Sequence, residues 1–298
     1  MVYPSSITCL PRKVADALSQ PPHAQPYPRF AIEDVVATEE YRTLCDEFPD
    51  VLIDHEGSFG SFNIHPSDQI DSRLSRSWMQ FLEALRSPSM KEQLVQVCYP
   101  HAVSRYPLWM QPMLRNRLRN PNNYEVNIAF NSSTEHRYLP PHSDNSYKVL
   151  ALVFYVTRFT DESFGLGTHF FSPRNKTAVR DAVKRFNRLA DSSLVRKLPL
   201  WLLPMTSCNI HNDSRNDRER HDADIWFQSN FCQDFTIGYK GNRMAGFIKS
   251  HGSFHAVDLR DVALDEPRRT LLINLNLKHS VYVRFGQSFR SRVLRKST

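Results

Sequence analysis

The hydrophobic period of the chain changes near Tyr124, and this change limits the fold more than any other feature of the sequence. Before it, apolar residues recur at helical spacing, as Trp78, Phe81, Leu82 and Leu85 do. After it, "YEVNIAF" alternates and "KVLALVFYV" runs apolar, as half-buried and fully buried strands do. Because the helices precede the strands and do not alternate with them, a parallel doubly wound sheet is disfavoured. An antiparallel α+β fold with a mainly β core is predicted.

An insert separates two groups of strand signals. Residues 174–234 begin with a helical stripe and continue with "HNDSRNDRERHDAD", which predicts an exposed, mobile loop. Strand signals return in "FTIGYKG", "RMAGFIK", "SFHAVDL" and "RRTLLINLNL". We therefore expect one domain over 1–298. Its mainly helical support covers 1–120, with an irregular, proline-rich stretch over 1–30, and its core covers 121–285 and contains the insert.

Composition narrows the class of protein. The chain is 41% hydrophobic, enough for a sizeable core, yet no window approaches the roughly 18 apolar residues of a membrane span. Its five cysteines are widely spaced and form no C-x-x-C, which indicates reduced thiols. The N-terminal segment lacks the pattern of a secretory signal, so we expect a cytoplasmic protein. The net charge of +7 suits an acidic ligand, but no basic run of five residues supports nucleic-acid binding.

His142 and Asp144 stand directly before the apolar strand signal "KVLALVFYV". Two imidazoles and one carboxylate on one face of an octahedron bind Fe(II), and residues two apart on a strand point the same way. The alternative is a turn in which Asp144 caps the backbone, because a bare H-x-D is expected about once by chance in such a chain. A second H-x-D, His211 and Asp213, lies in the charged insert and is interpreted as solvated.

The second half of the chain supplies the other groups that such a site needs. His255 ends a short strand signal, and Arg268 and Arg269 open the last strand. Arginine holds a carboxylate by two parallel hydrogen bonds, which suits a dicarboxylate bound beside a metal ion.

Four segments, in order, resemble the 2-oxoglutarate/Fe(II)-dependent oxygenases, in the branch that is similar to prolyl hydroxylases. They are "YLPPHSDNSYKVLALVFYV", "GLGTHFF", "GNRMAGFIKSHGSFHAV" and "RRTLLINL". The resemblance covers roughly residues 124–173 and 235–277. It implies a double-stranded β-helix, or jelly roll, with N-terminal helices packed against it and a helical and loop insert.

The resemblance implies that His142, Asp144 and His255 are the iron ligands. His251, four residues before His255, competes for the third position, but "SFHAV" is the part that matches the family. Members of the family that halogenate carry a small residue in place of the aspartate. Asp144 therefore implies hydroxylation or another oxidation.

The resemblance also implies a site for the cosubstrate. The family pattern is arginine, any residue, a small residue and an aliphatic one, which Arg268 fits with Thr270 after it. Arg269 would then face away. Tyr124 and Asn127, on the preceding strand, either contact the cosubstrate or only pack.

The implied activity consumes 2-oxoglutarate and O2 at Fe(II), and it oxidises an unactivated C–H bond of a small, anionic substrate. A peptidyl hydroxylase that acts on a protein and a non-catalytic, cupin-like binding module are the alternatives. The family joins its middle strands by a short connection, whereas residues 174–234 intervene here. Several members of the family also have a second glycine where this chain has Leu166. The insert is interpreted either as a lid, whose Arg215, Arg218 and Arg220 meet the substrate, or as a solvated loop.

Overall fold

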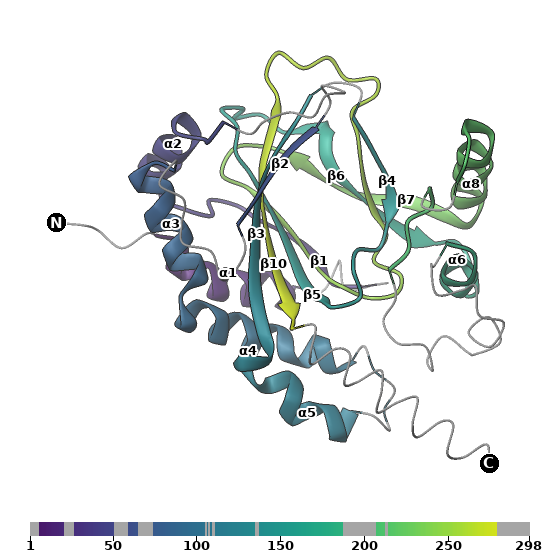
Figure 1. Cartoon of the computed structure of the whole chain (residues 1–298), viewed down its shortest axis with the longest axis horizontal. Coiled ribbons are helices and arrows are strands. Elements are labelled where there is room, and N and C mark those ends of the chain that lie inside the picture. The colour runs from purple at the N-terminus through teal and green to yellow at the C-terminus, as the bar shows by residue number, and fades with distance from the viewer. Residues whose placement is uncertain are drawn as a thin grey trace.

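Two antiparallel sheets and a layer of N-terminal helices make up the described part of the chain (Figure 1). The computed structural model describes residues 6–20, 27–50, 59–64, 74–104, 106, 108, 111–134, 137–186, 207–211 and 214–278. The α+β class with a mainly antiparallel β core is confirmed. None of the described helices has the length and apolar character needed to cross a membrane.

The larger sheet has six strands in the order β1-β8-β5-β10-β3-β2, and the smaller has four in the order β4-β9-β6-β7. The strands of the larger sheet are β1 (Arg29–Ile32), β8 (Met244–Ile248), β5 (Lys148–Tyr155), β10 (Arg268–Leu277), β3 (Tyr124–Ser133) and β2 (Phe59–Ile64). Those of the smaller sheet are β4 (Tyr138–His142), β9 (His255–Asp258), β6 (Ser163–Pro173) and β7 (Phe231–Tyr239).

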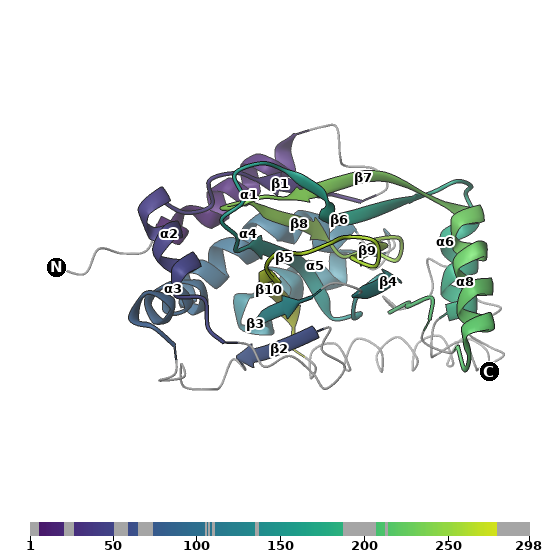
Figure 2. The same cartoon turned by 90° about the horizontal axis from the view of Figure 1, so that it is seen from above.

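The helices cover the outer face of the larger sheet, as the two views agree (Figures 1 and 2). They are α1 (Leu10–Ser19), α2 (Thr38–Asp46), α3 (Arg76–Arg86), α4 (Pro88–Ser104) and α5 (Gln111–Arg119), with short 3-10 turns at Ser6–Cys9 and Pro121–Asn123. Trp78 is fully buried on α3, and its ring lies 4.8 Å from that of Phe130 on β3. Aromatic contacts of this kind join the helices to the sheet.

Alternation along the strands divides the larger sheet into two chemically different faces. Val126, Ile128 and Phe130 of β3 belong to the core beneath the helices. Ala151 and Tyr155 of β5 belong to a second core, which the smaller sheet completes from the other side. The residues that alternate with the helix-facing ones therefore point toward the smaller sheet.

The N-terminal third differs from expectation in two places. The stretch over 1–30, expected to be irregular, contains α1, which tolerates Pro11 because proline fits the first turn of a helix. The mainly helical region also contributes the strands β1 and β2, one at each edge of the larger sheet. Pairing with neighbours distant in sequence fixes both strands, so local periodicity gives little sign of them.

The insert is more helical than expected. Its first helix is confirmed as α6 (Ala178–Phe186), while residues 187–206 lie outside the described part. The loop predicted over 211–224 is wrong in its second half, where α8 (Asp217–Asn230) begins, and β7 starts three residues before the expected end of the insert. The Asn216 side chain caps α8 by accepting from the Glu219 backbone N–H. Only Ala223 and Phe227 are buried on it, too few to show a helical stripe in the sequence.

Tyr41 ties α2 to the end of β5. Its hydroxyl accepts from the Thr157 N–H at 2.8 Å and donates to the Thr157 carbonyl at 2.5 Å. Tyr41→Phe leaves both backbone groups unpaired, so we expect a loss of about 1–3 kcal/mol in the free energy of unfolding, measured by urea denaturation. Tyr99→Phe on α4, a half-buried tyrosine outside this contact, is the control. Equal stability of the two variants would contradict this role for Tyr41.

Candidate metal centre

His142 and His255 face each other across two paired strands. His142 is the last residue of β4 and His255 the first of β9, and the two are partners in the antiparallel register. Their ring centroids lie 4.2 Å apart. Ligand atoms of His142, Asp144 and His255 all fall within 4.8 Å of one another, so these three side chains can hold one metal ion.

Asp144 reaches the histidines through a turn and not through regular strand alternation. β4 ends at His142, and Asp144 adopts a left-handed backbone with φ of 45°. This conformation is uncommon for residues other than glycine, although aspartate tolerates it. The local reason for the cluster is therefore a tight turn between β4 and β5, which differs from the same-face strand geometry expected from the sequence.

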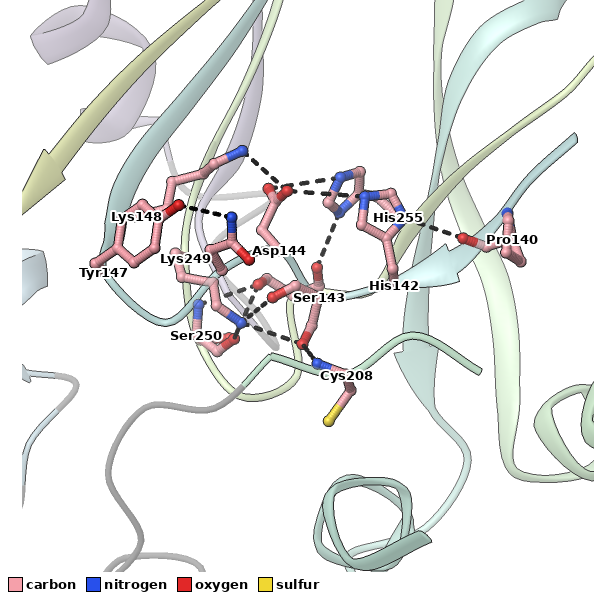
Figure 3. A network of polar contacts seen from close by, with 12 residues as sticks. Pro140, His142, Ser143, Asp144, Tyr147, Lys148, Cys208, Lys249, Ser250 and His255 are labelled. Carbon is pink, nitrogen blue, oxygen red and sulfur yellow. Dashed lines mark hydrogen bonds and ion pairs between the residues drawn. The ribbon is translucent and has the colours of Figure 1, made fainter. Parts of the chain in front are cut away.

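Asp144 lies among three basic side chains (Figure 3). Its Oδ1 is 2.9 Å from Lys148 Nζ and 3.7 Å from His142 Nε2, and its Oδ2 is 3.6 Å from His255 Nε2. Burial acts to raise the pKa of this carboxyl, but the positive charge and hydrogen bond of Lys148 oppose it, and the pKa lies well below its ordinary value. The side chain therefore stays a carboxylate, as metal binding requires.

The hydrogen bonds of the two histidines leave the lone pair of each Nε2 available to a metal ion. Nδ1 of His142 lies 3.0 Å from the Pro140 carbonyl, and Nδ1 of His255 lies 3.1 Å from the Ser253 carbonyl. A carbonyl only accepts hydrogen bonds, so it places the ring proton on Nδ1 and leaves Nε2 free to ligate. Burial lowers the pKa of both rings, that of His255 to about 3 with a further contribution from His142, which keeps them neutral.

One oxygen of the cluster lacks a hydrogen bond. Asp144 Oδ2 is buried and has no hydrogen-bond partner in the described part of the chain. Such an orphaned, charged oxygen is costly, and a cation beside it would remove the cost. The donor set, two imidazole nitrogens and one carboxylate oxygen, is the one that binds Fe(II) and leaves coordination positions open.

A second network fixes the turn between the ligands (Figure 3). Lys249, fully buried, donates from Nζ to the Ser143 carbonyl, to Ser143 Oγ at 3.1 Å and to the Ser250 carbonyl at 2.9 Å. The Ser143 N–H donates to the Cys208 carbonyl at 2.8 Å. The chain after the insert's first helix thus packs beside the ligand turn. Neither Lys148 nor Lys249 was singled out in the sequence, although the spacing of four between Asp144 and Lys148 was visible there.

Arg268 and Arg269 lie on opposite faces of β10. Arg268 is buried, donates from Nε to the Leu166 carbonyl at 2.7 Å, and places its guanidinium 5.5 Å from the Tyr155 ring centroid. Its Nη2 has no hydrogen-bond partner in the described residues. Arg269 lies instead over Phe48, 5.5 Å from the ring centroid, on the helix side. Arg268 is thus the one that presents an unused donor toward the space between the sheets.

The two residues of β3 considered for cosubstrate binding, Tyr124 and Asn127, lie on opposite faces of the strand. Tyr124 belongs to the helix-facing core and donates its hydroxyl to the Leu118 carbonyl at 2.7 Å, so packing is its role in this structure. Asn127 lies on the opposite face, opposite Asn274 of β10, and its buried Oδ1 has no partner within the described residues.

The remaining sequence candidates lie outside the cluster. His211 is not solvated, because its Nε2 is 2.8 Å from Asp224 Oδ1 on α8, and its side chain is 16% exposed. Asp213 lies outside the described residues, and His251 stands in the turn before β9. The three arginines expected to meet an anionic substrate are all exposed around the start of α8, and they are Arg215, Arg218 and Arg220.

Comparison with known proteins gives remote structural likenesses. No family model and no curated protein matches the chain. A prolyl-4-hydroxylase from Pseudomonas putida is 8% identical, with 89% of this chain and 99% of the other covered and a TM-score of 0.44. An oxidoreductase of the 2OG-Fe(II) oxygenase family from Burkholderia pseudomallei is 8% identical, with 89% of each chain covered and a TM-score of 0.42. HygX from Streptomyces hygroscopicus, with nickel, 2-oxoglutarate and hygromycin B bound, is 9% identical, with 85% and 84% covered and a TM-score of 0.40.

The names of these proteins include the ligands that the sequence resemblance implies, 2-oxoglutarate and iron. At such identities and TM-scores the likeness does not assign an activity to this chain. The functional conclusion rests on the chain's own residues.

The cluster predicts where a divalent metal binds. Asp144→Ala or His142→Ala removes one of three ligands, and we expect the dissociation constant for Mn(II), measured by titration calorimetry, to rise by more than about 100-fold. Loss of an outer-shell partner alone costs 10- to 100-fold in other metal sites. His211→Ala, which removes a histidine with its own carboxylate partner, is the control and should bind Mn(II) as the unaltered chain does. The reverse ranking would place the metal at the other H-x-D.

Proposed function

We propose that the chain is a 2-oxoglutarate- and Fe(II)-dependent dioxygenase that hydroxylates an unactivated C–H bond of a small molecule. The observation that carries the proposal is the convergence of two imidazoles on the Asp144 carboxylate, His142 on Oδ1 and His255 on the orphaned Oδ2. Arg268 adds an unused donor on the same side of the larger sheet. A non-catalytic binding module has no need of both features.

The arrangement of strands supports the corresponding fold. The orders β8-β5-β10-β3 and β4-β9-β6-β7, all antiparallel and packed through one shared core, fit a double-stranded β-helix to which β1 and β2 add edges. Helices α1–α5 and the insert helices α6 and α8 complete a single oxygenase domain in this proposal.

Each residue of the centre has a distinct part. Bound Fe(II) would supply the oxidative chemistry, in which one oxygen atom of O2 enters succinate and the other the substrate, with release of CO2 from 2-oxoglutarate. His142, His255 and Asp144 hold the metal. Lys148 engages Asp144 Oδ1, while Oδ2 is directed at His255.

Arg268 is assigned to the distal carboxylate of 2-oxoglutarate. A guanidinium that is already buried, braced by the Leu166 carbonyl and flanked by Tyr155 and Tyr239, is preorganised to take a carboxylate on its free Nη2. The hydroxyl of Tyr155 contacts Thr168 Oγ1 at 2.8 Å, which fixes this wall of the pocket proposed for the cosubstrate.

The direct test is succinate formation from 2-oxoglutarate by the purified chain without a prime substrate, with and without Fe(II). We expect slow, Fe(II)-dependent formation that a chelator stops and that Asp144→Ala abolishes while far-UV circular dichroism stays unchanged. A metal-loaded chain that binds 2-oxoglutarate but forms no succinate would contradict the proposal.

The two arginines give a matched pair for the cosubstrate. Arg268→Ala loses charge-assisted hydrogen bonds of about 1.5–3 kcal/mol, so the KM for 2-oxoglutarate should rise roughly 10- to 150-fold. Arg269→Ala, on the opposite face of the same strand, should change it less than about twofold. The opposite result would mean that β10 is shifted by one residue, because neighbouring strand residues face opposite sides.

A further inference from the structure

The inner face of β3 and β10 carries a row of neutral polar side chains beside the candidate metal centre. In the antiparallel register Asn127 is opposite Asn274, and Glu125 is opposite Asn276. The residues that alternate with these on both strands belong to the helix-facing core, so the row faces the smaller sheet. Exposed Asn63 extends the same face onto β2 at the edge of the sheet.

Hydrogen-bonding capacity is left unused along this row. The Oδ1 atoms of Asn127, Asn131 and Asn276 are buried and have no partner among the described residues. A buried, unpaired polar group costs on the order of 1–3 kcal/mol, so each such group in a folded protein calls for a partner such as a ligand or a bound water. Asn276 is 3% exposed, whereas Asn127 is half-buried.

Asn274 and Asn276 lie toward the end of β10, whereas Arg268 begins this strand. Asn276 pairs with Lys148, whose Nζ contacts Asp144, because a β-bulge at this point turns Lys148 inward. Arg268 lies eight residues before Asn276 on the same strand. A cosubstrate that spans the distance from the metal toward Arg268 therefore leaves the Asn276 end, with Asn127 and Asn274, for the substrate.

The charges at this end disfavour an anion. Lys148 Nζ is engaged by Asp144 and Lys249 Nζ by oxygens of Ser143 and Ser250, while the acidic residue Glu125 is the register partner of Asn276. The side-chain amide of asparagine donates hydrogen bonds from its nitrogen and accepts them at its oxygen. A hydroxyl group of a ligand can pair with either atom, because it both donates and accepts. A neighbouring carboxylate accepts hydroxyl donors equally well but repels carboxylates and phosphates.

We propose that Asn127, Asn274 and Asn276 bind the hydroxyl groups of a neutral, polyhydroxylated substrate, such as a sugar or cyclitol unit. This deepens the proposed function and rests on it. It replaces the anionic substrate expected from the net charge. The three arginines expected to meet such an anion are exposed around the start of α8. It also assigns Asn127 to the substrate and not to the cosubstrate.

A first test needs no ligand. Asn276→Leu replaces a buried carboxamide whose Oδ1 is unpaired by an apolar group of similar size, so the melting temperature of the ligand-free chain should rise. The control is Thr168→Val, a near-isosteric change at a buried residue whose hydroxyl is bonded to Tyr155, and its melting temperature should fall. A fall for Asn276→Leu as large as that for Thr168→Val would show a structural role for the carboxamide and overturn the proposal.

The second test uses the full chain loaded with Mn(II) and 2-oxoglutarate. It is applied to an array of neutral oligosaccharides and cyclitols, together with size-matched sulfated sugars and short peptides. We expect binding to neutral probes, weakened at least tenfold in Asn127→Leu, with the dissociation constant for 2-oxoglutarate changed less than twofold. Hits confined to sulfated or peptide probes, the absence of a neutral hit, or a neutral hit that Asn127→Leu leaves unchanged would each overturn the proposal.

Failure of this inference differs from failure of the proposed function. If the unaltered chain forms succinate in the presence of Fe(II) but its neutral probes fail, only the substrate class is wrong. If the chain binds neutral sugars through Asn127 but forms no succinate, the site is a sugar-binding one and the oxygenase proposal is wrong.

Discussion

The pairing of His142 with His255 across β4 and β9 is the constraint on which the rest of the site depends. It joins two segments far apart in sequence at one register position and sets their rings 4.2 Å apart. The turn that follows β4 then needs only two residues to bring Asp144 to both rings. A slip of this register by one residue would turn a histidine to the other face of its sheet and dissolve the cluster.

Around that pair, the two sheets separate apolar packing from polar chemistry. The helix-facing side of β3, β5 and β10 is apolar and stabilises the fold, whereas the inner side carries the groups with unused hydrogen-bonding capacity. Asp144 Oδ2, Arg268 Nη2 and Asn276 Oδ1 each reduce the stability of the ligand-free chain. We attribute these unpaired atoms, in the turn after β4 and on the inner face of β10, to ligands that would satisfy them: a metal ion, a carboxylate and hydroxyl groups respectively.

The sequence predicted much of the fold and of the candidate metal centre, but not all of either. The apolar runs located β5 and β10, and the resemblance to a known family named His142, Asp144 and His255 together. The left-handed turn at Asp144 and the clamp of Lys249 on Ser143 could not be seen, because they depend on long-range contacts. Alternation in "YEVNIAF" showed two faces but not which one meets the helices, so Tyr124 remained ambiguous. α8 was missed because most of its residues are polar, and tertiary packing of two apolar side chains decides its position.

The most direct test of the central claim is a crystal structure of the chain with Mn(II) and 2-oxoglutarate, with anomalous data that locate the metal. We predict one strong anomalous peak bound by Nε2 of His142, Nε2 of His255 and a carboxylate oxygen of Asp144. The distal carboxylate of 2-oxoglutarate should lie on Arg268, with the Asn276 end of β10 left open beside the metal. A peak elsewhere, or a metal at this site with 2-oxoglutarate bound away from Arg268, would contradict the account.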